Sequence, residues 1–201
     1  MTIAYDMNVS LDHIGENLKE FKPAFGRVEK IDSGYIFLIK NPTSATEVLS
    51  TIVPNIKKND RILIALNDNF ADGKDISWIW DAEFEMLINW SSRAKRGDRI
   101  DEKKIATSPQ TPRNDAHIIT SGSRAHDMAL RLKYAGITPD HIIIQPSIKQ
   151  ALEEARRSLS ALPAGRQGTL YVLPTYTALL ELQHLLAKQG AKKEYWKEDH
   201  E

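Results

Sequence analysis

Apolar residues in this chain form short continuous runs that alternate with amphipathic stretches, a pattern typical of parallel sheets packed between helices. The clearest run, residues 61–66 (RILIAL), lies between two Asn-Asp pairs and predicts a buried interior strand. Because parallel strands need long crossover connections, helices are expected between the strands. Further runs predict strands at 27–31, 35–40, 117–120, 141–145 and 169–173, the first two joined as a hairpin through Asp32-Ser33-Gly34.

Helical spacing places helices in most of the gaps between these strands. Ser44, with Glu47 three residues later, forms the capping box of the first helix, and Pro174 is expected in the first turn of the last. The helices are expected at 44–53, 125–135, 147–159 and 174–190. The fold class is thus α/β, a Rossmann-like, mainly parallel sheet of about five to six strands with helices on both faces.

The same patterns divide the chain into regions. Residues 1–22 are a helical lead-in, residues 23–191 form the domain, and residues 192–201 are a charged tail. Residues 89–115 are rich in charge, Ser, Pro and Thr, which predicts a surface insertion. Basic residues in this insertion either contact phosphates or are simply solvated, which is the commoner case. They are Arg93, Lys95, Arg96 and Arg99.

Composition narrows the class of function. Lysine plus arginine and aspartate plus glutamate both number 27 in the 201 residues, so no net field attracts nucleic acid or anionic lipid. Without cysteine the chain has no thiol nucleophile or disulfide, and its six scattered histidines show no metal-binding spacing, so no metal site is expected. No secretory signal and no apolar run of the ~20 residues that span a bilayer is present, which predicts a soluble, cytoplasmic protein.

The stretch after the interior strand carries the candidate chemistry. Ligand sites in parallel sheets lie beyond the carboxyl ends of strands, which is where the polar loop NDNFADGKD (67–75) stands. Asp75 occupies the place of a helix N-cap, and apolar side chains then recur at spacings of three and four, predicting a helix over 76–88. Its buried face would carry Ile76, Ile79, Trp80, Phe84, Leu87 and Ile88. The polar face of this helix carries Trp78, Asp81 and Glu85. A solvent-facing Trp78 indicates a contact with another protein, because exposed tryptophans are enriched at protein contacts.

Two alternatives for this stretch stay open from the residues alone. Asp75 as a plain N-cap explains the residue without any function. An edge strand instead of a helix would place Ile76, Trp78 and Trp80 together on one face, because side chains in a strand alternate with a period of two.

A second candidate corner follows the strand at 117–120. A Ser-Gly-Ser turn leads there into a helix, and a helix N-terminus after a strand favours anions. Arg124 lies at this corner, and its plain alternative is a solvent-facing helix arginine. Neither GxGxxG nor GxxxxGK[ST] occurs in the sequence, so no phosphate-binding loop is expected in this chain.

Several blocks of the sequence resemble the C-terminal domain of the Mur ligases, and more closely that of the MurT subunits of lipid II isoglutaminyl synthase. The blocks occur in the family's order and span most of the chain. The most specific block is LNDNFADGKDISWIWDAEFE (66–85). The others are FKPAFGRVE (21–29), KNP (40–42), TSGSRAHDMALRLKYAG (120–136) and LPTYTALLEL (173–182).

This resemblance implies an ATP-dependent amidation in peptidoglycan and cell-wall synthesis, catalysed by a carbon–nitrogen ligase with glutamine as amido donor. In such an enzyme the α-carboxylate of D-glutamate in lipid II becomes an acyl phosphate, which ammonia from a GatD-type glutaminase converts to D-isoglutamine. ATP and magnesium are expected mainly on a P-loop Mur ligase domain in the same or a separate chain, so the isolated domain is expected to be inactive and free of cofactor. The expected location is the cytoplasm, at the inner face of the membrane.

The family's functional residues carry over at matching positions. Asp75 matches the acidic residue of the D-x-S-W motif, which is proposed to orient the histidine of the partner glutaminase and complete its triad. The partner interface would then include Trp78, Asp81 and Glu85. The substrate cleft would be lined by Asn67, Asp68, Asn69 and Arg124.

The chain also departs from the family's pattern. It reads SGSR at 121–124, without the Asp-Asn-Pro that holds an incoming amino acid, which argues against the alternative of an amino-acid-adding Mur ligase domain. It lacks the P-loop domain and the four-cysteine zinc insertion, so it is expected to be an excised domain or a split subunit. A Rossmann-like interaction module without catalysis is the alternative from a different class.

Overall fold

A computed structural model of the chain describes residues 28–88, 118–163 and 165–188, together with Ser10, Asp12, His13 and Glu16. Apart from those four residues, the helical lead-in predicted at 1–22 lies outside the described residues. The charged insertion at 89–115 and the charged tail at 192–201 lie outside them as well.

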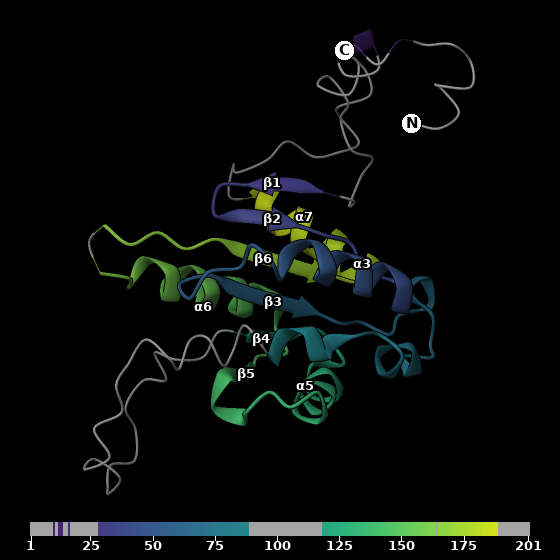
Figure 1. Ribbon diagram of the computed structural model, residues 1–201. Helices are drawn as coiled ribbons and strands as arrows, with labels where there is room; N and C mark the ends of the chain where they lie inside the picture. Colours follow the sequence, from purple (N-terminus) through teal and green to yellow (C-terminus); the bar gives the residue numbers. More distant parts are fainter. Residues whose placement is uncertain are drawn as a thin grey trace, which may run out of the picture.

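A six-stranded sheet forms the centre of the described structure, in the order β1-β2-β6-β3-β4-β5 (Figure 1). Neighbouring strands are parallel except β1 and β2, which form the predicted hairpin. The strands are β1 (Glu29–Ile31), β2 (Gly34–Ile36), β3 (Arg61–Ala65), β4 (Ile118–Ser121), β5 (Ile142–Ile144) and β6 (Leu170–Pro174). The prediction of a mainly parallel sheet is confirmed.

The strand β3 is the interior strand that the sequence predicted. It lies between β6 and β4, and all of its residues are buried. Ile62 and Ile64 join the apolar cluster on one face of the sheet, whereas Leu63 and Ala65 join the cluster on the other. Because both faces are covered, the strand is apolar continuously rather than at alternate positions.

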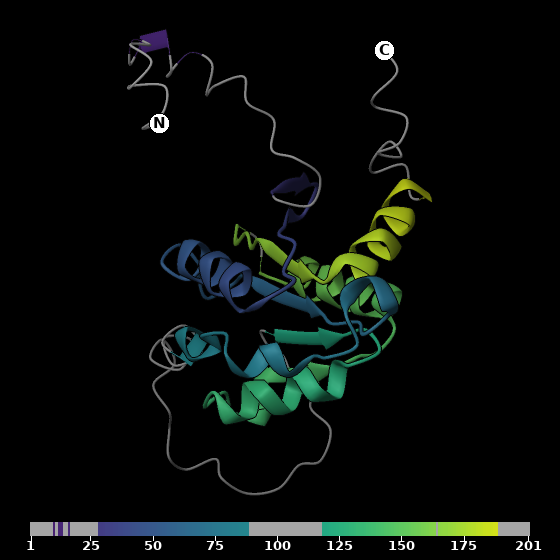
Figure 2. The ribbon, with the colours of Figure 1, turned by 90° about the vertical axis from the view of Figure 1, so that its right-hand side faces the viewer.

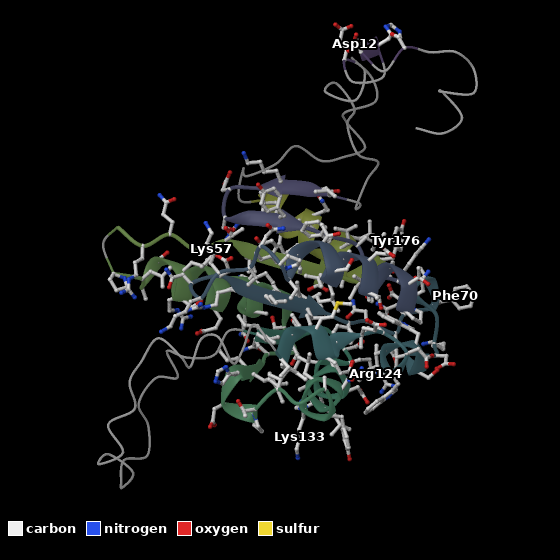
Figure 3. All side chains as sticks on the ribbon, viewed as in Figure 1. Asp12, Lys57, Phe70, Arg124, Lys133 and Tyr176 are labelled. Carbon is white, nitrogen blue, oxygen red and sulfur yellow. The ribbon has the colours of Figure 1, made fainter. Side chains whose placement is uncertain are left out.

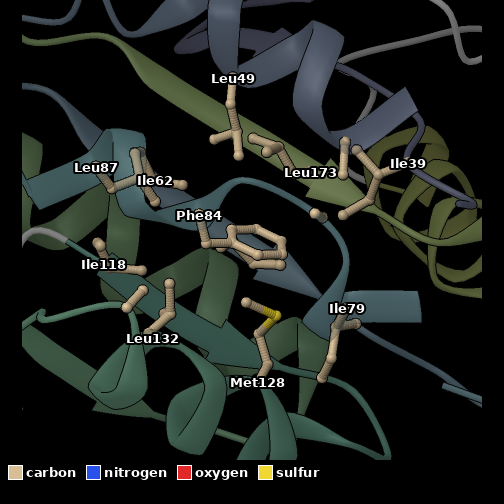
Figure 4. Close-up of a cluster of buried hydrophobic side chains, with 14 of the residues drawn as sticks. Ile39, Leu49, Ile62, Ile79, Phe84, Leu87, Ile118, Met128, Leu132 and Leu173 are labelled. Carbon is tan, nitrogen blue, oxygen red and sulfur yellow. The ribbon is translucent and has the colours of Figure 1, made fainter. Parts of the chain in front are cut away.

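Helices cover both faces of the sheet, and Figure 2 shows α3 and α7 on opposite sides of it. On one face α3 (Pro42–Ile52) and α5 (Ala125–Tyr134) pack against the sheet. On the other face lie α6 (Ile148–Ser160) and α7 (Tyr176–Lys188). The core of the first face, shown in Figure 4, includes Leu49, Ile62, Phe84, Met128 and Leu132.

Two helix starts differ from the prediction. The N-cap of α3 is Asn41, whose Oδ1 accepts the Ser44 N–H at 2.8 Å, while Ser44 Oγ accepts the Asn41 N–H at 3.2 Å. The capping box therefore begins three residues earlier than predicted, because Pro42 lacks an N–H and fits the first turn. Pro174 is the last residue of β6, where its carbonyl accepts the N–H of Ile39 at 2.9 Å, and α7 begins only at Tyr176.

The predicted helix over 76–88 is wrong, and so is the alternative of an edge strand there. The stretch after β3 forms three short 3₁₀ helices, η1 (Phe70–Asp72), η2 (Ser77–Trp80) and η3 (Phe84–Met86). Apolar residues of the predicted inner face still reach the core, since Ile79, Phe84 and Leu87 are all buried.

Tertiary contacts replace the hydrogen bonds that an α-helix would need here. In an α-helix the carbonyl of Ile79 would accept the N–H of Glu83. Instead, the Glu83 N–H donates to Thr46 Oγ1 at 3.1 Å, and the Ile79 carbonyl accepts Arg131 Nε at 2.9 Å. Side chains from α3 and α5 thus hold the stretch in short turns.

Candidate functional site

The candidate site lies where the carboxyl ends of β3, β4 and β6 meet. The segment after β3 runs over one face of the sheet, whereas α7, which follows the last strand β6, packs on the other face. Parallel α/β sheets bind their ligands outside the carboxyl ends of such strands. Figure 3 shows Phe70, Arg124 and Tyr176 on the side of the molecule toward which the arrow of β3 points in Figure 1.

Asn67 connects the three strand ends. Its Oδ1 accepts the Ser123 N–H at 2.9 Å after β4, and its Nδ2 donates to Thr177 Oγ1 at 3.1 Å after β6. Its own backbone N–H donates to Thr175 Oγ1 at 3.0 Å. Because the Asn67 side chain is buried and engaged at both ends, it fixes the shape of this edge.

Thr177 is the second junction of the edge, and the sequence analysis missed it. Its Oγ1 accepts Asn69 Nδ2 at 2.8 Å and donates to Asp72 Oδ2 at 2.5 Å. The Thr177 N–H also donates to Asp72 Oδ1 at 2.8 Å, which holds η1 against the start of α7. The sequence could have indicated this role, because Thr175 and Thr177 come shortly after the strand predicted at 169–173. In a parallel sheet, the carboxyl end of that strand lies at the same edge as Asn67.

Asp68 and Arg124 form the charged part of the edge. Asp68 Oδ1 accepts the Ser123 hydroxyl at 2.8 Å, and Asp68 Oδ2 lies 3.2 Å from Arg124 Nε, an ion pair without the alignment of a hydrogen bond. The Ser123 hydroxyl and, less strongly, the Arg124 guanidinium hold the pKa of Asp68 below its ordinary value of 3.8. Arg124 also lies 3.6 Å from Asp127, so it is a paired residue and not only a solvated one.

Gly122 allows the turn after β4 to approach β3 closely. Its φ is 87°, a conformation that side chains with a Cβ rarely adopt. A Cβ at this position would lie 2.4 Å from the Leu66 carbonyl oxygen and 2.6 Å from Asn67 Oδ1. The glycine is thus required for the contact between Asn67 and Ser123.

The structure brings the predicted cleft residues Asn67, Asp68, Asn69 and Arg124 together at one edge. They offer amide, carboxylate and guanidinium groups, which suit a polar or anionic ligand. Within the described part of the chain, no group of three or more His, Cys, Asp or Glu residues is placed to hold a metal ion. That these four residues bind substrate stays a prediction.

Asp75 is not joined to this edge by any hydrogen bond or ion pair among the described residues. Its side chain is exposed, and Oδ1 accepts the Ser77 N–H at 2.8 Å, which lowers the pKa of Asp75 below its ordinary value. Asp75 therefore makes the local hydrogen bond that the capping alternative expects. The N-cap residue of η2, however, is Ile76. Beside this bond the carboxylate stays ionised and exposed, where a partner can reach it.

The two tryptophans exchange their predicted places. Trp78, predicted to face solvent, is only partly exposed and packs against the core, whereas Trp80, predicted to face the core, is exposed. The reason is the change from an α-helix to 3₁₀ turns, which alters the angle between successive side chains. Asp81 and Glu85 are exposed as predicted.

A separate depression of about 800 Å³ lies at the opposite edge, around the amino end of β6. Basic, hydroxyl and amide side chains line it together with Asp32, and none of the predicted site residues belongs to it. Its basic residues are Lys30, Arg156 and Arg166. None of the helices in the described ranges combines the length and the apolarity that crossing a bilayer requires.

The strand order and the carboxyl-edge cluster define a doubly wound α/β domain. The chain belongs to the MurT ligase C-terminal family, whose pattern matches residues 38–107 and 106–179. A similar protein is the lipid II isoglutaminyl synthase (glutamine-hydrolyzing) subunit MurT of Streptococcus pneumoniae (strain ATCC BAA-255 / R6), 28% identical over 199 residues that cover 96% of this chain and 38% of that protein. The subunit of the same name from Staphylococcus aureus (strain COL) is 31% identical over 144 residues, which cover 72% of this chain and 25% of that protein.

This chain thus spans less than two fifths of the length of these curated relatives. Among solved structures, a folylpolyglutamate synthase of Mycobacterium tuberculosis complexed with ADP and AMPPCP aligns with a TM-score of 0.40 and 15% identity. The alignment covers 79% of this chain and 30% of that one, a likeness too weak to support any statement on function.

Proposed function

We propose that this chain is the C-terminal domain of the ligase subunit of an amidotransferase that converts the D-glutamate α-carboxylate of lipid II into the amide of D-isoglutamine. Membership of the MurT ligase C-terminal family supports this proposal most directly. The relatives are named as subunits of a glutamine-hydrolyzing lipid II isoglutaminyl synthase, which supports a second, glutaminase subunit as the source of ammonia.

ATP and magnesium belong, in this proposal, to the remainder of the enzyme. The sequence has no phosphate-binding loop, and the described residues offer no metal-binding group. At the carboxyl edge, Asp68 is engaged by Ser123 and Arg124, and Asp72 is engaged by Thr177. These residues do not fit a complete ATP–magnesium site, so their part is to line the cleft that the rest of the enzyme closes.

Within that cleft the edge acts on the substrate. Arg124 is partly exposed and presents a guanidinium group that can pair with a carboxylate of the stem peptide. Ammonia needs no side-chain pocket, which agrees with the short turn at 121–124. Excluding water from this edge protects an activated carboxyl group from hydrolysis.

Asp75 acts on the glutaminase subunit. Its ionised, exposed carboxylate accepts a hydrogen bond from the partner's catalytic histidine and fixes the tautomer of that ring. When the partner's cysteine thiol gives its proton to the histidine, Asp75 stabilises the imidazolium without becoming protonated. The Ser77 N–H holds Oδ1 in place, so the carboxylate is oriented before the subunits meet.

Asp75→Asn in the assembled enzyme, with its P-loop ligase domain on the same or a separate chain, tests this assignment. With the glutaminase subunit present, glutamine-dependent amidation should fall by up to about 10⁴-fold, as the loss of a triad acid does elsewhere. Amidation driven by added ammonia should be retained, because that route bypasses the partner's active site. Asp140→Asn, which changes an exposed carboxylate in another part of the chain, is the matched control and should alter neither rate.

A purely local role for Asp75 gives a different result. Asn accepts a capping hydrogen bond about as well as Asp, so Asp75→Asn would then leave both the glutamine-driven and the ammonia-driven rates unchanged. If wild-type protein with its partner forms no isoglutamine from lipid II, the proposed reaction itself is wrong.

A further inference from the structure

A group of exposed apolar side chains lies on α5 and η2, apart from the carboxyl-edge cluster. Trp80 is 49% exposed and Tyr134 is 72% exposed, and their ring centroids lie 5.6 Å apart in an edge-to-face arrangement. Leu130, 46% exposed, lies one helical turn before Tyr134 on α5. We call these three residues the α5 patch. Neighbouring exposed apolar side chains of this size often mark a contact surface.

Arg131 holds Trp80, one of the two rings of the α5 patch, in place. The guanidinium carbon of Arg131 lies 5.6 Å from the centre of the Trp80 ring, close enough for a cation–π contact. Arg131 is itself buried and fixed by hydrogen bonds to the carbonyls of Ile79 and Ala82. An aromatic side chain that is already fixed loses little conformational entropy when a partner covers it.

The segment that carries Trp80 is also acidic. Residues 75–85 contain no lysine or arginine, and their carboxylates are exposed. They belong to Asp75, Asp81 and Glu83, and to Glu85, whose carboxylate is already paired with Arg131. A partner surface with an apolar socket and a rim of Lys or Arg would be complementary both in shape and in charge.

We infer that the α5 patch is the docking surface for the second subunit of the enzyme, which presents such a socket and rim. The inference rests on the proposed function, which places Asp75 against that subunit. Asp75 and Trp80 are five residues apart in sequence and so at most about 18 Å apart. Both then fall within one interface of standard size, about 800 Å² on each partner. The aromatic centre of the interface is Trp80 and not Trp78.

The P-loop ligase domain, on the same or a separate chain, is the competing occupant of this surface. The cleft-facing edge and the α5 patch lie toward different ends of α5, because Arg124 precedes the first residue of the helix and Tyr134 is its last. Ten helical residues rise about 15 Å, which separates the two surfaces. A ligase domain that closes over the carboxyl edge and reaches only the start of α5 leaves the α5 patch available to another subunit, and the experiment below separates the two occupants.

The test uses the assembled ligase, with its P-loop domain on the same or a separate chain, and the glutamine-hydrolysing subunit from the same source. Trp80→Ala and Tyr134→Ala, singly and together, are compared with wild type for the Kd of the two subunits and for amidation driven by ammonia. The double variant should raise the Kd at least 30-fold, the effect of losing a central aromatic contact. Leu130→Ala should also weaken binding, whereas Ile144→Ala, an equally large side chain that is 43% exposed on β5, should not.

Each outcome has one meaning. A raised Kd with unchanged ammonia-driven amidation supports the inference. An unchanged Kd with reduced ammonia-driven amidation assigns the α5 patch to the P-loop ligase domain and overturns the inference. No change in either also overturns it. Tyr134→Ala alone is informative even if Trp80→Ala unfolds the domain, because Tyr134 is mostly exposed. The Kd is measured without any turnover, so failure of the proposed reaction would not be mistaken for failure of the interface.

Discussion

At the scale of single residues, the Arg131 side chain joins α5 to the stretch that contains η2 and η3. It is buried in α5, donates to the carbonyls of Ile79 and Ala82 at 2.9 Å and 2.8 Å, and pairs with Glu85 at 2.8 Å. The stretch that contains η2 and η3 is thereby attached to α5. Removing the guanidinium would leave two carbonyls of this stretch without their partner, which is more costly than losing one surface ion pair.

Arg131→Met keeps the length of the side chain and removes its donors, and it should lower the free energy of unfolding by about 3 kcal/mol. Glu85→Gln is the matched control and should cost less than about 1 kcal/mol, because Glu85 is largely exposed and its ion pair is screened by solvent. Urea denaturation of the chain measures both values. Equal, small losses for the two variants would mean that Arg131 does not hold the stretch in place.

The sequence predicted side chains well where a regular element contains them and poorly elsewhere. In the predicted helix at 125–135, the spacing of Ala125, Met128 and Leu132 indicates one inward face, and all three are buried because α5 is a regular helix. Trp78 and Trp80 were assigned to the wrong faces because their segment is not an α-helix. Local spacing cannot reveal a hydrogen bond from Arg131, which lies 52 residues after Ile79.

At the scale of elements, the turn between β4 and α5 controls the shape of the candidate site. Gly122 and Gly73 have nearly the same positive φ, 87° and 88°, yet their surroundings differ. A Cβ on Gly122 would lie 2.4 Å from the Leu66 carbonyl oxygen, whereas a Cβ on Gly73 would meet nothing within 4 Å. The pair therefore separates the cost of the backbone conformation from the cost of the close contact.

Gly73→Ala should lower the free energy of unfolding by about 1 kcal/mol, the cost of the positive φ alone. Gly122→Ala should cost at least about 2 kcal/mol, because β3 and the turn must also move apart. In nuclear magnetic resonance spectra, the Ser123 amide that donates to Asn67 should shift in Gly122→Ala and not in Gly73→Ala. Equal stabilities for the two variants would contradict the close approach.

At the scale of the whole molecule, the fold class could be predicted because interior strands of a sheet covered on both faces are continuously apolar in sequence. Residues 61–66 are apolar throughout, and β3 is buried throughout. The gathering of Asn67, Asp68 and Arg124 at one edge followed from strand direction together with the family resemblance. The contribution of Thr177 and the α5 patch depend on which elements become neighbours, and that is decided by the strand order, which periodicity does not contain.

The last prediction concerns the chain as a unit separated from the rest of the enzyme. Phosphoryl transfer from ATP needs a cradle for the phosphates and a residue that holds magnesium, and the sequence contains no loop of that kind. The 201-residue chain alone should therefore turn over no ATP and form no isoglutamine from lipid II, even with ammonia, whereas the enzyme that includes a P-loop ligase domain, on the same or a separate chain, should do both. A coupled ATPase assay and mass spectrometry of the lipid II product measure these activities, and circular dichroism confirms that the chain is folded.

ATP turnover that persists through purification of the chain and disappears in Arg124→Ala would show that the carboxyl edge itself binds ATP. The division of labour proposed above would then be wrong, because the nucleotide would react on this domain and not on the part of the enzyme that closes over it.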